Sequence, residues 1–87
     1  MNMIDFFYDE YNDDDWIDFA NCFDKVDIII KGVPQDVINA VYSIIGNNGG
    51  DWFNTPLRKF DGKTALELLL SEKGEKALKA FIMRIPN

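Results

Sequence analysis

Hydrophobic residues recur along this chain at spacings of three and four, the spacing of one face of an α-helix. Apolar side chains fall at positions 16, 19, 20 and 23, directly after a run of aspartates suited to a helix start. A second helical pattern runs from Pro34 to Gly46, and a third runs from Ser71 toward Pro86. Residues 3 to 10 predict a shorter helix. The pattern therefore predicts a mainly α fold, a small single domain of four to five short helices.

The best-marked helix start lies at Thr64. Its hydroxyl suits an N-cap, and Glu67 stands three residues later, as in a capping box. Gly62 permits a sharp turn into this helix. The leucines at 66, 68, 69 and 70 are too widely distributed for one stripe, which predicts a largely buried helix over 65 to 70. The residues expected in the core here are Trp52, Leu66, Leu69 and Phe81.

Residues 26 to 31 (VDIIIK) are rich in β-branched side chains, which favours a short strand. No second segment of the chain offers a convincing partner strand. An extended linker is the alternative interpretation.

Charge divides the chain into two parts. Residues 1 to 27 contain nine acidic residues and one lysine, although the net charge of the whole chain is only -6. We therefore expect an acidic, aromatic N-terminal segment (1 to 32) packed on or flanking a helical body (33 to 87). An acidic face repels nucleic acid and favours basic protein partners, although it also simply improves solubility.

The composition excludes several classes of protein. An apolar content of 47% argues against disorder, and no apolar run is long enough for a membrane span. A single cysteine, Cys22, cannot form an internal disulfide and is expected to be a small core residue. The start lacks the pattern of a secretory signal, so we expect a cytoplasmic protein.

Candidate chemistry is sparse. The chain has no histidine, which removes the usual nucleophile and metal systems, and no residue pattern indicates a cofactor. The aspartate run lacks the spacing of a calcium loop. We expect neither enzymatic activity nor direct binding of nucleic acid. The residues expected to contact a partner are an acidic group with a neighbouring tryptophan and a group of basic residues. They are Asp13, Asp14, Asp15 and Trp16, and Arg58, Lys59, Lys63 and Arg84.

Residues 34 to 85 carry motifs in a distinctive order. They read Trp52-Phe53-x-x-Pro56, then Gly62-Lys63-Thr64-Ala65-Leu66-Glu67-Leu68-Leu69, then Ser71-Glu72-Lys73-Gly74, then Arg84-Ile85. This order resembles the C-terminal toxin-binding domain of Xre/MbcA/ParS-type antitoxins. The helix-turn-helix domain that usually precedes it in that family is lacking here.

The resemblance implies a bacterial or phage inhibitor that binds and blocks a RES-type toxin. Two alternatives stay open. One is a phage anti-defence protein, comparable to an anti-CRISPR, that imitates nucleic acid with its acidic face and binds a basic nucleic-acid-binding defence protein. The other is a structural or dimerisation module, for instance a homodimer.

Overall fold

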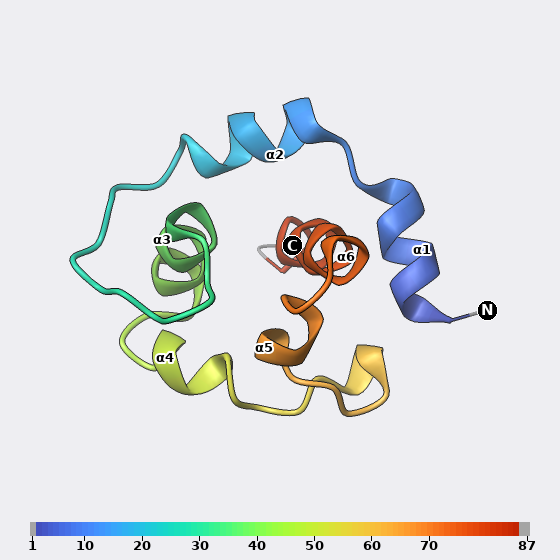
Figure 1. Ribbon diagram of the computed structural model, residues 1–87. Helices are drawn as coiled ribbons and strands as arrows, with labels where there is room; N and C mark the ends of the chain where they lie inside the picture. The colour runs from blue at the N-terminus through green and yellow to red at the C-terminus, as the bar shows by residue number, and fades with distance from the viewer. Residues whose placement is uncertain (1, 86–87) are drawn as a thin grey trace.

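The fold is mainly α, as predicted. The computed structural model describes residues 2–85, which form six α-helices and one 3-10 helix: α1 (Met3–Glu10), α2 (Asp13–Ala20), α3 (Gln35–Ile45), α4 (Gly49–Trp52), η1 (Arg58–Phe60), α5 (Ala65–Leu68) and α6 (Glu72–Ile82). Helix α6 lies at the centre, and the other elements form a ring around it (Figure 1). Pro86, expected to end the last helix, lies outside the described residues.

Polar side chains mark most of the helix starts. The predicted capping box is present, because the Thr64 hydroxyl accepts from the Glu67 amide and the Glu67 carboxylate accepts from the Thr64 amide. The Ser71 hydroxyl caps α6 by accepting from the Gly74 amide at 3.0 Å. Gly46 ends α3 with a φ of 90°, a conformation that favours glycine.

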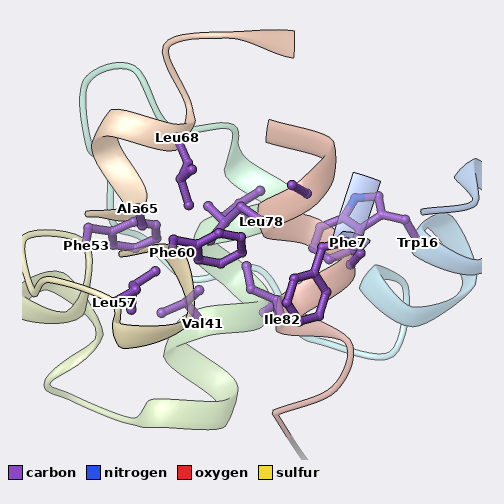
Figure 2. Close-up of a cluster of buried hydrophobic side chains, with 14 of the residues drawn as sticks. Phe7, Trp16, Val41, Phe53, Leu57, Phe60, Ala65, Leu68, Leu78 and Ile82 are labelled. Atoms are coloured by element: carbon purple, nitrogen blue, oxygen red, sulfur yellow. The ribbon is translucent and has the colours of Figure 1, made fainter. Parts of the chain in front are cut away.

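One hydrophobic core joins both parts of the chain. The N-terminal segment contributes Phe7 and Trp16, which are 3% and 2% exposed, and Figure 2 shows them in one cluster with residues of the body. The Phe7 ring lies 5.5 Å from the rings of both Phe60 and Phe81. Residues 2–32 therefore pack on the body, since Phe7 and Trp16 complete the core of residues 33–85.

Two expectations about buried segments need correction. The helix after Thr64 ends at Leu68, two residues early, because Ser71 already begins α6. The following Leu70 is 86% exposed. The structure buries Phe53, Phe60, Ala65 and Leu68 in this region, whereas the expected core residues Trp52, Leu66, Leu69 and Phe81 are only half-buried against that core.

Residues 26–31 form no strand among the described residues, so the linker interpretation is correct. Val26 is held instead by side chains of α3, because its amide donates to Asn39 and its carbonyl oxygen accepts from Gln35. Cys22 is also not a core residue. It is exposed just after α2, where its thiol donates to the Asp18 carbonyl oxygen at 3.4 Å.

Candidate protein-binding surface

The outer side of α2 carries a dense group of exposed carboxylates. This group, which we call the α2 acidic face, consists of Asp13, Asp14, Asp15 and Asp18. The first three occupy the first turn, where the positive end of the helix dipole favours negative charge. Asn12 begins the helix as its N-cap, accepting from the Asp15 amide at 3.1 Å. Asp13, Asp14 and Asp15 therefore favour the start of the helix and leave their negative charge exposed to solvent.

Trp16 anchors this helix to the body. Its indole nitrogen donates to the Asp36 carboxylate of α3 at 2.8 Å, and its ring is 2% exposed. Trp16, expected to contact a partner, is thus buried within the molecule. A tryptophan one turn into an amphipathic helix packs inward here, while its aspartate neighbours point outward.

The three lysines of α6, and Arg84 just after its end, form no ion pair with the α2 acidic face. Two of them pair with α1, through Lys73 to Asp5 and Arg84 to Glu10. The other two pair within α6, where Lys76 meets Glu72 at 3.2 Å and Lys79 meets Glu75 at 3.0 Å. Among residues 2–85, no carboxylate of the α2 acidic face has an ion-pair partner. The face therefore keeps exposed negative charge, although one lysine of α6, Lys76, lies close enough to one of its carboxylates, Asp13, to interact with it.

The lysines of α6 and Arg84 also lie over aromatic rings of the N-terminal helices or of the loop that joins them. The distances from Lys73 to Tyr8, Lys76 to Tyr11 and Lys79 to Trp16 are 5.4, 6.0 and 5.4 Å from ammonium to ring centre. The Arg84 guanidinium lies 5.6 Å from the Phe6 ring and 5.7 Å from the Phe7 ring. Such contacts attract a cation to the face of a ring. Arg84, expected to contact a partner, is thus engaged within the molecule.

Burial raises the pKa of Tyr11 in this region, and a hydrogen bond raises the pKa of Lys73. A hydrogen bond to Asp5 raises the pKa of Lys73, which keeps this ammonium charged. Partial burial raises the pKa of the Tyr11 phenol, and a hydrogen bond to Asp13 raises it further. Both groups therefore hold their protons throughout the neutral range.

The three other basic residues expected at a contact lie elsewhere. Arg58 and Lys59 belong to η1, and Lys63 follows the turn that η1 begins. A backbone bridge between Leu57 and Lys63 closes this turn. Figure 1 places η1 across α6 from α2. The structure therefore brings the basic trio together but separates it from the α2 acidic face.

A groove beside the basic trio was not predicted. It has a volume of about 440 Å³ and runs between the start of α1, the end of α5 and the start of α6. Its lining combines apolar and charged side chains, among them Ile4, Leu70, Lys63, Glu67 and Lys73. The expected helix end at residue 70 concealed it, because that helix would have buried Leu70, which lines the groove in the structure.

Comparisons of the chain with family models, with curated proteins and with solved structures found no match. Within residues 2–85 no helix is both long and apolar enough to cross a membrane. The same residues contain no cluster of three or more side chains suited to hold a metal ion. The antitoxin resemblance stays a prediction.

Proposed function

We propose that this chain is a non-enzymatic inhibitor that binds a basic surface of another protein through the α2 acidic face. The observation that carries the proposal is the exposed charge of Asp13, Asp14, Asp15 and Asp18, none of which has an ion-pair partner among residues 2–85. A face that only improves solubility would do as well with its charges paired or spread over the molecule. Here Lys73 and Arg84 instead pair with carboxylates of α1.

The anchoring of α2 favours recognition. Trp16 is buried and hydrogen-bonded to Asp36, so the helix presents its carboxylates in a fixed arrangement. A fixed charged surface loses little conformational entropy on binding, and complementary charge speeds the encounter with a partner. The antitoxin resemblance makes a RES-type toxin the first target to test.

Imitation of nucleic acid is the second candidate function. It is supported by the density of carboxylates on one short helix, since a nucleic-acid-binding channel is lined by cations that select for closely spaced negative charge. The two functions differ in their competitors. DNA or RNA should displace the chain from a nucleic-acid-binding protein but not from a toxin.

Both functions are tested by replacing Asp13, Asp14 and Asp15 with asparagine in one variant. The tagged wild-type protein and this variant are each used to capture partners from bacterial lysate at low and moderate salt. We expect a basic protein that the wild type retains and the variant loses by tenfold or more. Asparagine preserves the shape of the side chains, so α2 should stay folded.

The matched control removes the same charge elsewhere, by replacing Asp51 and Asp61 with asparagine and Glu72 with glutamine. These three carboxylates are exposed and lie outside α2. Equal losses in both variants would mean that only net charge matters, and would refute a dedicated α2 acidic face. Full retention by the α2 variant would refute it as well.

A further inference from the structure

The loop between α2 and α3 contains a strand-like stretch, residues 26–31, that pairs with no other segment among residues 2–85. Its side chains alternate as in a strand. Val26, Ile28 and Ile30 are half-buried against the core, whereas the three residues between and after them are exposed. Ile29 is 91% exposed, the highest exposure among the large hydrophobic side chains described. Figure 1 shows this loop on the periphery, remote from α6.

Among residues 2–85, the backbone of this stretch is hydrogen-bonded only at Val26 and at the Ile30 carbonyl oxygen, so the amide and carbonyl of Ile28 are free. Val26 bonds α3 side chains through its amide (3.0 Å) and its carbonyl oxygen (3.1 Å), and the Ile30 carbonyl oxygen accepts from Val33 at 3.0 Å. The amides and carbonyls of Asp27, Ile29 and Lys31 have no hydrogen-bond partner among residues 2–85. In an extended chain, alternate residues direct these groups to the same edge.

From this edge we infer that residues 27–31 pair with the same residues of a second copy of the chain. The pairing is a short antiparallel ladder whose two-fold axis passes through Ile29. An unpaired edge with an exposed apolar side chain is a template for strand addition. Water can satisfy the free amides and carbonyls, but it does not cover Ile29.

The charges on the outer face select this occupant and this register. With Ile29 opposite Ile29 of the second copy, Asp27 stands opposite Lys31, and Lys31 opposite Asp27. Opposite charges and β-branched pairs across strands are both favourable, and a two-fold axis forms each pair twice. In a parallel pairing, by contrast, like charges would face each other. The outer face is therefore complementary to itself in one direction only.

The geometry at both ends of the stretch keeps the ladder short. The chain bends at Asp27, the first paired residue, and the last one, Lys31, already belongs to a turn with Gly32, whose φ is +82°. A contact this small buries much less than a standard interface, so the dimer should be weak and is sought up to about 1 mM protein. This inference is independent of the α2 acidic face.

The first test is sedimentation equilibrium of the full chain and of Ile29→Glu. We expect concentration-dependent dimerisation of the wild type and at least tenfold weaker dimerisation of the variant. Since Ile29 is almost fully exposed, its replacement should leave the thermal melt unchanged. The matched control is Leu70→Glu, because Leu70 is also strongly exposed but lies outside the stretch. This control variant should dimerise like the wild type. A monomeric wild type at 1 mM, or dimers that tolerate Ile29→Glu, would overturn the inference.

Charge reversal tests the register. Asp27→Lys and Lys31→Asp should each weaken self-association, because two like charges then face each other twice. The double variant Asp27→Lys/Lys31→Asp restores both pairs and should dimerise again. An equimolar mixture of the two single variants should form mixed dimers. Failure of both the double variant and the mixture would refute the antiparallel pairing.

Discussion

Replacing Phe7 with alanine would test whether the acidic N-terminal segment is an integral part of the fold. Phe7 is 3% exposed and contacts the rings of Phe6, Phe60 and Phe81 at centre distances of 5.2 to 5.5 Å. Truncating a buried phenylalanine to alanine costs about 3 to 5 kcal/mol, because transfer free energy is lost and a cavity is left. Loss of the edge-to-face contacts places Phe7 toward the upper end of this range.

That cost is large for this protein. A chain of 87 residues has a free energy of unfolding of about 4 to 13 kcal/mol. The variant should therefore unfold at a much lower urea concentration, or be largely unfolded in buffer. The control is Ile17→Ala in α2, where the side chain is 53% exposed and the change should stay within about 0.5 kcal/mol.

The assay follows the indole signals of Trp16 and Trp52 separately by two-dimensional NMR during urea titration. Trp16 reports on the N-terminal segment and Trp52 reports on the body. We expect both signals to change in one transition, and Phe7→Ala to shift both by the same amount. A variant that keeps the wild-type midpoint at Trp52 would refute the single core.

Three further predictions concern the junction of α5 and α6. Gly74→Ala should prevent stable folding, because a Cβ there would overlap the Leu68 carbonyl oxygen. Loss of the cooperative thermal transition would confirm this prediction, and a melting curve like that of the wild type would contradict it. Leu68→Ala should lower the free energy of unfolding in urea by about 2 to 5 kcal/mol, since Leu68 is 2% exposed. Leu69→Ala should lower it by less, because Leu69 is only half-buried, and the reverse order would refute these burial assignments. The backbone hydrogen bond from Thr64 lowers the pKa of Glu67, so this contribution to stability is present above the unfolded pKa and is lost as pH falls through the folded value. Glu67→Gln should therefore flatten the dependence of stability on pH as pH falls below the usual glutamate pKa of 4.5, and an unchanged profile would contradict this.

Local signals predicted the helices well. The capping box at Thr64, the cap at Ser71 and the helix end at Gly46 are short-range features, in which neighbouring residues satisfy each other's backbone groups. Burial was predicted less well. Leu70 belongs to a hydrophobic run, yet it faces solvent because α6 begins immediately after it. Only the tertiary packing of α5 against α6 decides this, and periodicity does not contain it.

The candidate surface shows the same division. The exposure of Asp13 to Asp15 follows from the charge and the helix start, both visible in the sequence. The roles of Trp16 and Arg84 cannot be read from local sequence, because Trp16 bonds Asp36 and Arg84 pairs with Glu10, both distant in the chain. Composition identified the charged residues, but the fold decides which of them pair with each other and which remain directed outward.

The most direct test of the proposed function is a hydrogen–deuterium exchange footprint of the chain with its captured partner. The account predicts that slowed exchange concentrates in α2 and its flanking turns, where Asp13, Asp14, Asp15 and Asp18 lie. Protection confined to η1 and the groove around Leu70, with α2 unchanged, would contradict it.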